Sequence, residues 1–219
     1  MKETEYHKIN TIFRRDLESN FKRLLLGEFS LPEFEYLQNN NWIFTEKVDG
    51  TNIRIEFNSN ITKDSTLHTN IYGKTEDSQI PKLLLDTIID LYRLRLPKFF
   101  DVFVPDSSVT LYFEGYGSKI QKGGGKYRTD QSIVLFDINI DGWWLHRKNV
   151  DDVAKDLEFD TVPIVGKGTL NDMIKLVEGG FKSNWGDFIA EGIVARPEIE
   201  LKTRSGDRII TKLKYKDFH

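Results

Sequence analysis

The sequence predicts an α+β protein with largely antiparallel sheets and flanking helices. Two observations favour this class: stretches rich in β-branched and aromatic residues outnumber helical patterns, and hairpin signals join several of them. The strongest hairpin signal is Asp141-Gly142, which separates strands predicted over residues 132–140 and 143–147. Further strands are predicted over residues 42–48, 52–57, 109–115, 189–195 and 208–215.

Four helices are predicted between these strands. The second repeats apolar side chains at steps of three and four, the third is expected to be capped by Asn149, and the fourth begins at Thr169 and Asp172 with capping-box spacing. The four lie over residues 31–40, 80–96, 151–160 and 169–179.

Composition favours one folded domain over residues 1–219. Aromatic residues make up 12% of the chain, which excludes disorder by composition. Cysteine is absent, so disulfides and thiolate metal sites are excluded. No apolar run reaches the ~18 residues of a membrane span, and the first residues, MKETEYHKIN, do not resemble a signal peptide. We therefore expect a cytoplasmic protein without a membrane partner.

The charges are segregated along the chain, although the net charge is only −3. Residues 201–219 carry six Lys or Arg against two Asp, and residues 115–128 carry four basic side chains and no acidic one. Such segregation predicts an electropositive face that suits a nucleic acid. An ordinary solvated surface is the alternative explanation.

The densest chemical signal is the string TEKVDGTN around Lys47, at a turn between two predicted strands. A surface lysine before a hairpin is the alternative. The last predicted strand holds Lys212 and Lys214, whose spacing places both ammonium groups on one face and Leu213 on the other. That pair is either a phosphate clamp or the charged edge of a sheet.

Five strings, in order, resemble the signature motifs of the covalent nucleotidyltransferases: EKVDG, YFEG, FDI, EGIV and KLK, from Glu46 to Lys214. This superfamily includes ATP-dependent DNA ligases, RNA ligases and mRNA capping enzymes. The longer strings EKVDGTN and EGYGSKIQKGGGKYR are most similar to the phage RNA ligase 2 type. The resemblance implies a nucleotidyltransferase (adenylation) domain that uses ATP and Mg²⁺, or Mn²⁺ in its place. The implied partner is RNA with a nick or broken ends, with DNA or an RNA/DNA hybrid as further candidates.

The resemblance also implies a reaction through a covalent lysyl-AMP. Lys47 attacks the α-phosphate of ATP, AMP passes to a 5′-phosphate end, and a 3′-hydroxyl displaces it. The amine must be neutral, although a free lysine has a pKa of about 10.4; lysine suits the role because its pKa shifts readily. Asp49 and Glu191 would hold Mg²⁺ directly or through water. Lys212 and Lys214 would neutralise charge on the α-phosphate.

The remaining implied roles concern the nucleotide. Glu46 would help to read the adenine edge, Glu114 would hold the ribose hydroxyls, and Asn52 would serve nucleotide binding and the later sealing steps. Phe136 would stack on one face of adenine and Val194 would cover the other. For Phe136, a plain core phenylalanine is the alternative.

The sequence departs from the family pattern in two respects. These ligases usually have an arginine in a short strand after the first motif, and the best candidate here is Lys74, which keeps the charge and loses the fork geometry. Only five residues follow Lys214, so we expect a bare nucleotidyltransferase module without a C-terminal OB domain.

Residues 115–128 form a glycine-rich basic loop that we interpret as a contact for nucleic-acid phosphates. Three consecutive glycines should preclude regular packing, and a flexible hairpin end is the alternative. Arg14 and Arg15 are further candidates for meeting the departing pyrophosphate. The predicted strand contacts are Lys74, Lys119, Lys122, Lys126 and Arg128, together with Asn52.

An ATP-dependent RNA ligase is therefore the function that we expect. A DNA ligase or capping-type transferase on the same core is one alternative. A non-catalytic nucleic-acid-binding relic is another, although a relic need not keep Lys47, Asp49, Glu191, Lys212 and Lys214 together.

Overall fold

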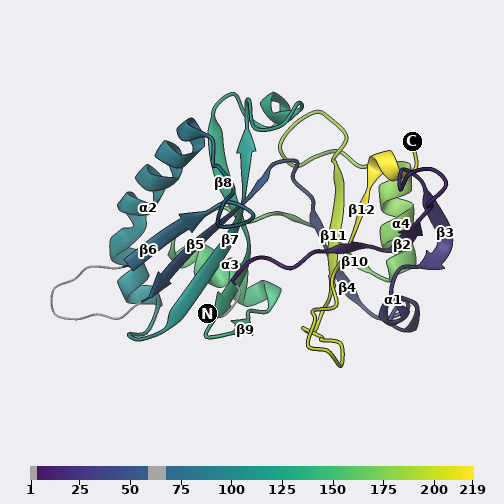
Figure 1. The fold of residues 1–219 in the computed structure, drawn as a ribbon, viewed down its shortest axis with the longest axis horizontal. Coiled ribbons are helices and arrows are strands. Elements are labelled where there is room, and N and C mark those ends of the chain that lie inside the picture. Colours follow the sequence, from purple (N-terminus) through teal and green to yellow (C-terminus); the bar gives the residue numbers. More distant parts are fainter. Residues whose placement is uncertain (1–3, 59–67) are drawn as a thin grey trace. The chain divides into compact units, whose positions relative to one another are not determined.

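The computed structural model describes residues 4–58 and 68–219, and it divides the chain into two compact units (Figure 1). Unit 1 comprises the residues up to Tyr6 and Asp49–Val162, and unit 2 comprises His7–Val48 and Pro163–His219. Each unit thus draws on more than one stretch of the chain. One domain over residues 1–219 stays a prediction.

Unit 1 is built on a five-stranded antiparallel sheet in the order β6-β5-β7-β8-β9. Two helices, α2 and α3, pack against strand β8, and the apolar side chains between helices and sheet form one core. Phe57, Leu84 and Phe113 are among its buried members. The elements are β5 (Thr51–Asn58), β6 (His68–Tyr72), α2 (Lys82–Val102), β7 (Ser108–Gly117), the 3₁₀ turn η1 (Gly124–Lys126), β8 (Gln131–Ile140), β9 (Trp143–Trp144) and α3 (Arg147–Asp156).

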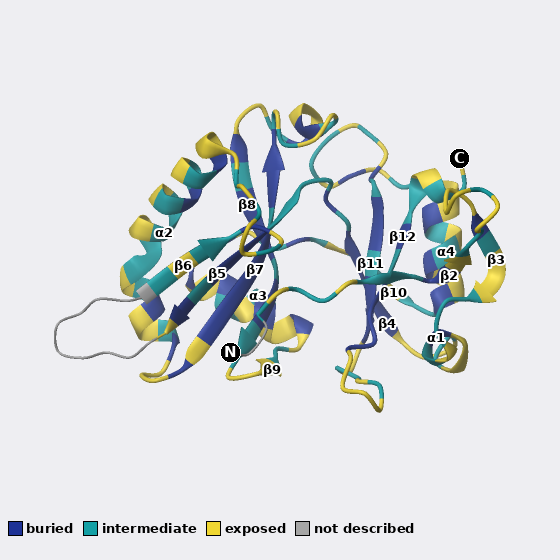
Figure 2. Cartoon of the chain, in the orientation of Figure 1, coloured by how far each residue is buried: buried dark blue, intermediate teal, exposed yellow. Residues whose placement is uncertain are grey.

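Unit 2 is built on a second five-stranded sheet in the order β1-β12-β11-β4-β10, beside the two-stranded pair β2-β3. Helix α4 packs against β10, β11 and β12, and the core between them includes Trp42, Phe44 and Leu213. Figure 2 shows the buried residues of this core along the strands. The elements are β1 (Asn10–Thr11), β2 (Phe13–Arg15), β3 (Leu24–Phe29), α1 (Pro32–Tyr36), β4 (Trp42–Glu46), β10 (Ile164–Gly168), α4 (Leu170–Gly179), β11 (Gly192–Pro197), β12 (Thr211–Lys214) and η2 (Tyr215–Asp217).

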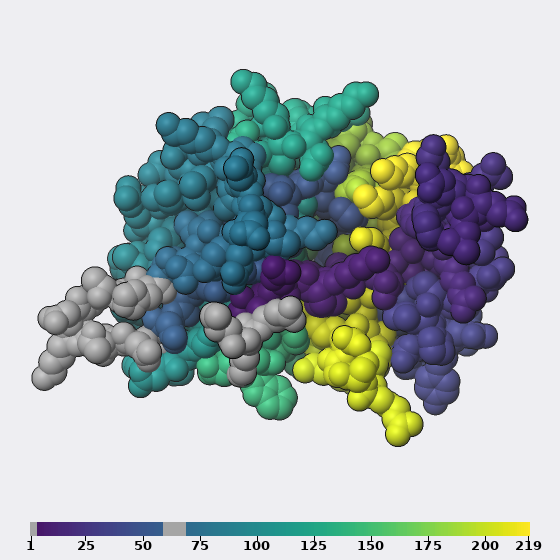
Figure 3. Space-filling view, in the orientation of Figure 1, coloured from purple at the N-terminus to yellow at the C-terminus, as the bar shows by residue number. Residues whose placement is uncertain are grey.

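The predicted fold class is confirmed: the chain is α+β, and every strand pair among the described strands is antiparallel except β1 with β12. That parallel pair brings the beginning of unit 2 beside its end, and the two segments adjoin on the surface in Figure 3. No helix among the described residues is long and apolar enough to cross a membrane.

Two helix predictions differ in outcome. Thr169 caps α4 with the full capping box, because its side chain accepts from the Asp172 amide and the Asp172 carboxylate accepts from the Thr169 amide. Asn149, in contrast, is the wrong cap for α3, which begins at Arg147. The buried Arg147 side chain donates to Asp151 one turn later, at 2.5 Å, and to the Val162 carbonyl at 2.8 Å. These bonds anchor the helix start three residues before the start that an Asn149 cap would give.

The turn after β4 does not close a hairpin. Strand β4 belongs to the sheet of unit 2 and β5 to the sheet of unit 1, so the chain passes from one sheet to the other between Glu46 and Thr51. Lys47 therefore follows the end of a central strand rather than a surface hairpin.

Candidate active site

The candidate nucleophile lies on a face of the unit 2 sheet that is rich in lysine. Strand pairing sets Thr45 beside Val194 and Val194 beside Lys212, and paired residues share a face. Ile193 and Leu213, their neighbours in sequence, are fully buried in the core on the opposite face. We call the face that carries Lys47, Val194, Lys212 and Lys214 the lysine face. The predicted alternation of Lys212, Leu213 and Lys214 is thereby confirmed.

Glu191 connects two cations of the lysine face. Its Oε2 lies 2.7 Å from the Lys47 ammonium, and its Oε1 lies 2.6 Å from the Lys214 ammonium. All three side chains are largely buried, with exposed fractions of 20%, 13% and 22% for Lys47, Glu191 and Lys214. The Lys47 ammonium also donates to the Val48 carbonyl at 3.2 Å. One carboxylate thus fixes the direction of both lysine side chains.

Lys212 is a cation of this face whose charged form is disfavoured. Burial lowers the pKa of its ammonium, and the like charges of Lys47 and Lys214 lower it further, while Glu191 acts in the opposite sense. Positive charge is therefore in excess on the lysine face. Such an excess suits an anionic ligand.

Glu46 lies on the opposite face of the unit 2 sheet from Thr45. It pairs with the core residue Ile193 and is 1% exposed, so its side chain leaves the sheet on the side opposite to Thr45. Its carboxylate accepts hydrogen bonds from the Ser183 hydroxyl at 2.6 Å and from the Asn184 amide and side chain at 2.9 and 3.0 Å. Glu46 thus holds the loop before β11, and its contact with the adenine edge stays a prediction.

The described residues offer few carboxylate ligands to a divalent cation. Across residues 4–58 and 68–219, no three His, Cys, Asp or Glu side chains gather as a ready metal site. Mg²⁺ commonly binds through one or two carboxylates and keeps several waters. Glu191 offers a carboxylate that two ammonium groups already surround, and Asp49 lies half-buried at the turn after Lys47.

Three predicted nucleotide contacts share the face of the unit 1 sheet that the helices leave uncovered. Asn52 pairs directly with Glu114 across β5 and β7, and Phe136 lies on the next strand, β8. The neighbours Ile53, Phe113 and Leu135 point into the core instead. The buried Asn52 Oδ1 has no hydrogen-bond partner among the described residues, so this face retains an unused acceptor.

Phe136 is half-buried and lies outside the main core of unit 1, which argues against its alternative interpretation as a plain core residue. The N-terminal Tyr6 packs edge-on against the Phe136 ring, with 5.0 Å between ring centroids, and donates to Asp137 at 2.7 Å. Sequence patterns gave no signal for Tyr6, because its partners lie more than a hundred residues away.

Lys74 is exposed on the connection between β6 and α2. The buried arginine of this region is Arg54, on the same face as Asn52. Its Nε lies 2.7 Å from Glu56, and its guanidinium stacks over Tyr72 at 4.6 Å. Arg54 was missed because a charged residue inside a β-rich run is typical of the solvent side of a strand.

The loop over residues 115–128 contains the 3₁₀ turn η1, which packs against β7. Lys119, Lys122 and Lys126 are exposed, as predicted for strand contacts. Arg128 differs, because it forms two hydrogen bonds to Asp130, at 2.5 and 2.8 Å, and lies 5.8 Å from the Tyr116 ring centroid. Asp130 stands two residues beyond the acid-free stretch, so the count over residues 115–128 missed the partner.

Comparison with known proteins decides the family. A family model described as RNA ligase matches residues 40–214, most of the chain. The chain belongs to the RNA ligase family. The search of curated proteins found no match.

Solved RNA ligases share the fold of this family member. Naegleria gruberi RNA ligase with PPi is 16% identical, with a TM-score of 0.62 over 98% of this chain and 60% of that chain. A mutant of the same ligase with ATP and Mn is 17% identical, with a TM-score of 0.63 over 99% of this chain and 59% of that chain. This chain therefore spans about three fifths of the length of those ligases.

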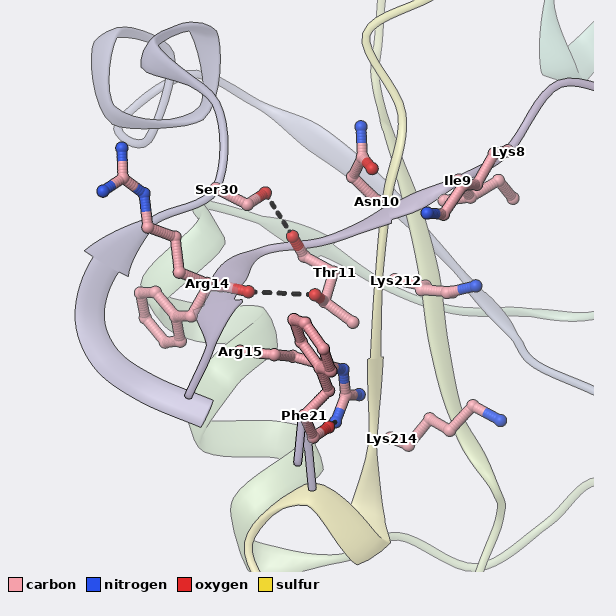
Figure 4. A pocket seen from close by; sticks show the side chains of 11 residues that line it. Lys8, Ile9, Asn10, Thr11, Arg14, Arg15, Phe21, Ser30, Lys212 and Lys214 are labelled. Carbon is pink, nitrogen blue, oxygen red and sulfur yellow. Dashed lines mark hydrogen bonds between the residues drawn. The ribbon is translucent and has the colours of Figure 1, made fainter. Parts of the chain in front are cut away.

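A basic pocket of about 360 Å³ adjoins the lysine face (Figure 4). Most of its lining residues precede residue 40, where the match to the RNA ligase family begins. Lys8, Arg14 and Arg15 line it together with Lys212 and Lys214. Figure 4 shows Arg14 pointing away from the two lysines of β12. Arg15 is held by Asp217 at 2.8 Å and by the Phe21 carbonyl at 3.2 Å. Arg15 thus connects β2 to Asp217 in η2, and a contact of either arginine with pyrophosphate stays a prediction.

Proposed function

We propose that this protein is an ATP-dependent RNA ligase that seals 5′-phosphate and 3′-hydroxyl ends through a covalent lysyl-AMP. The observation that carries the proposal is the bridge from Lys47 through Glu191 to Lys214 on the lysine face. A turn lysine with no chemical task would not be buried beside two further lysines, because like charges in one place destabilise the fold. Membership of the RNA ligase family supports the same conclusion.

The residues of the lysine face have different proposed roles in the adenylation step. Attack on the α-phosphate requires the uncharged Lys47 amine, whereas a neighbouring carboxylate favours the charged one. Glu191 must therefore release Lys47 before attack. Lys212 and Lys214 then stabilise the extra negative charge that develops on the α-phosphate. Val194, which pairs with Lys212 on the same face, is the proposed cover for one face of adenine.

Asp49 and Glu191 are the proposed ligands of the metal, Mg²⁺ or Mn²⁺, which would supply positive charge at the phosphates. Related ligases were solved with ATP and Mn, which supports both cofactors. Within unit 1, Glu114 and Asn52 are the proposed ribose and sealing contacts, and Phe136 the proposed stacking partner of adenine. An RNA with a nick or broken ends is the proposed partner, and the cytoplasm is the proposed location.

Incubation with α-³²P-labelled ATP and Mg²⁺ tests the proposal. We expect a covalent label that survives denaturation, resists alkali and is released by acid, as a P–N bond requires, on the wild-type protein and none on Lys47→Met, which keeps the length of the side chain without its amine. Lys167→Met is the matched control, because Lys167 is an exposed lysine of unit 2 that should keep the label. Absence of label on the wild type would refute adenylation. A label from GTP instead of ATP would indicate a capping-type enzyme.

An end-joining assay then separates the nucleic-acid classes. RNA, DNA and hybrid substrates, each with a 5′-phosphate beside a 3′-hydroxyl, are compared at equal concentration. Preferential sealing of RNA ends supports the proposal. Preferential sealing of an all-DNA nick would assign the chain as a DNA ligase.

A further inference from the structure

The basic loop of unit 1 is packed tightly against its own strands. Gly124 is buried, and a Cβ placed on it would lie 1.9 Å from the Gly117 carbonyl oxygen, so only glycine fits there. Tyr127 is 8% exposed and packs edge-on against Tyr116, with 6.2 Å between centroids. Such packing fixes the position of the Tyr127 hydroxyl.

The inner side of this loop holds the turn that follows the candidate nucleophile. The Asp49 backbone amide donates a hydrogen bond to the Tyr127 hydroxyl at 3.2 Å. The side-chain amide of Gln121 donates to the Gly50 carbonyl at 2.9 Å. Two loop residues therefore fix two consecutive residues of the turn, and all four residues lie in unit 1.

A third interaction closes the turn from the side of β7. A Cβ on Gly50 would lie 2.2 Å from the Gly115 carbonyl oxygen, so the backbone of the turn lies directly on the end of that strand. The turn thus has no room to move toward β7. The hydrogen bonds to Tyr127 and Gln121 limit its movement in other directions.

We propose that Tyr127 and Gln121 are positioning residues for adenylation, which fix the Asp49-Gly50 turn and hence the carboxylate that it carries. This inference rests on the proposed function, because it assigns the turn a metal-binding task. The same loop exposes Lys119, Lys122 and Lys126, so the segment that meets the polynucleotide is also the segment that sets the metal ligand. A bound strand and a correctly placed Asp49 therefore depend on one element.

Two variants each remove a hydrogen bond to the turn with little change of shape. Tyr127→Phe keeps the ring and loses the hydroxyl, and Gln121→Met keeps the chain length and loses the donor. Tyr92→Phe is the matched control, since it removes a hydroxyl that contacts Thr69 in the same unit and does not touch the turn. Thermal unfolding of all three confirms that each variant folds.

The first measurement is single-turnover formation of lysyl-AMP over a range of Mg²⁺ concentrations. A loosened Asp49 should raise the half-saturating Mg²⁺ concentration roughly two- to tenfold, the effect of removing one hydrogen bond, while the rate at saturating Mg²⁺ stays close to wild type. A merely structural defect would lower the rate equally at every Mg²⁺ concentration. Unchanged half-saturation in both variants, or an equal shift in Tyr92→Phe, would overturn the proposal.

The second measurement does not depend on activity. Amide hydrogen exchange at Asp49 should become faster in Tyr127→Phe, because that amide loses its acceptor. Unchanged exchange there would overturn the positioning role even if labelling succeeds. If the Asp49 amide exchanges faster in Tyr127→Phe while the wild-type protein is never labelled by ATP, the positioning of the turn by Tyr127 is confirmed and the proposed function is refuted.

Discussion

Lys47 and Glu191 share an ion pair that holds the amine beside Lys214. The amine is consumed only when lysyl-AMP forms, so its loss should separate the first step from the later ones. We expect Lys47→Ala to fail on an ordinary 5′-phosphate end and to join a pre-adenylated RNA strand at a measurable rate. Gel analysis of both substrates tests this, and sealing of the ordinary end by the variant would exclude Lys47 as the nucleophile.

The charged Lys212 side chain should lower the free energy of unfolding. Burial and like charges lower its folded pKa below the ordinary value of 10.5, so the unfolded chain binds the proton more tightly. Between the folded and unfolded pKa values, stability must therefore rise as pH rises. We expect Lys212→Met to be more stable than wild type near pH 7 and to lack this part of the pH dependence, while forming lysyl-AMP more slowly.

Urea unfolding of both proteins from about pH 7 to above the unfolded pKa tests the sign. Lys167→Met is a suitable control, because Lys167 is an exposed lysine of the same unit. A Lys212→Met protein that is less stable near pH 7 would show that this side chain stabilises the fold by packing more than its charge destabilises it.

The types and order of the residues predicted where several site residues lie, but they did not predict the contacts of all of them. Lys212 and Lys214 were placed correctly on one face because strand alternation is a local rule. Glu46 could not be placed, because its partners Ser183 and Asn184 lie more than 130 residues away. Charge counts likewise predicted a free Arg128 and missed its pairing with Asp130.

At the scale of single elements, the loop that carries Lys119, Lys122 and Lys126 predicts how strongly the affinity for a nucleic-acid strand depends on salt. Replacing all three by alanine should leave lysyl-AMP formation nearly unchanged and weaken binding of the strand. For each phosphate that the variant no longer neutralises, the slope of log affinity against log salt should fall by about 0.9 on a duplex and ~0.7 on a single strand.

Binding titrations at several salt concentrations measure this slope. A total fall of roughly two to three units means that all three lysines bind phosphates. A triple variant that loses adenylation and keeps the original slope would contradict the assignment of this loop to the nucleic acid.

Local signals also explain which elements were predictable. Helix α4 was predicted with its cap because Thr169 and Asp172 lie three residues apart and interact with each other. Strands β1 and β6 were missed, and so was β10, whose exposed Ile164 and shifted register blur the apolar alternation. Strand β1 has only two residues, and its partner β12 lies some 200 positions later. No local pattern encodes such a pairing.

The whole molecule should respond to its nucleotide by becoming harder to unfold, since ATP binds only the folded chain. At an ATP concentration 100 times the dissociation constant, binding adds about 2.7 kcal/mol, which raises the unfolding midpoint by roughly 5–10 °C for a chain of this size. Scanning calorimetry with ATP and Mg²⁺ measures the shift. Lys47→Ala should keep most of it, because binding precedes chemistry, and an unchanged midpoint of the wild type would argue against an ATP site.

The interleaved make-up of the two units imposes an order on biosynthesis. The ribosome makes β4 early, then the whole of residues 49–162, and only afterwards the strands β10 and β11 that flank β4. Until they emerge, the apolar side chains of Trp42 and Phe44 have no sheet to join, and such a segment is a natural substrate for chaperones. Lys47 meets Glu191 and Lys214 later still, so a nascent chain completes unit 1 well before the Lys47–Glu191–Lys214 bridge, on which the proposed adenylation depends, can form.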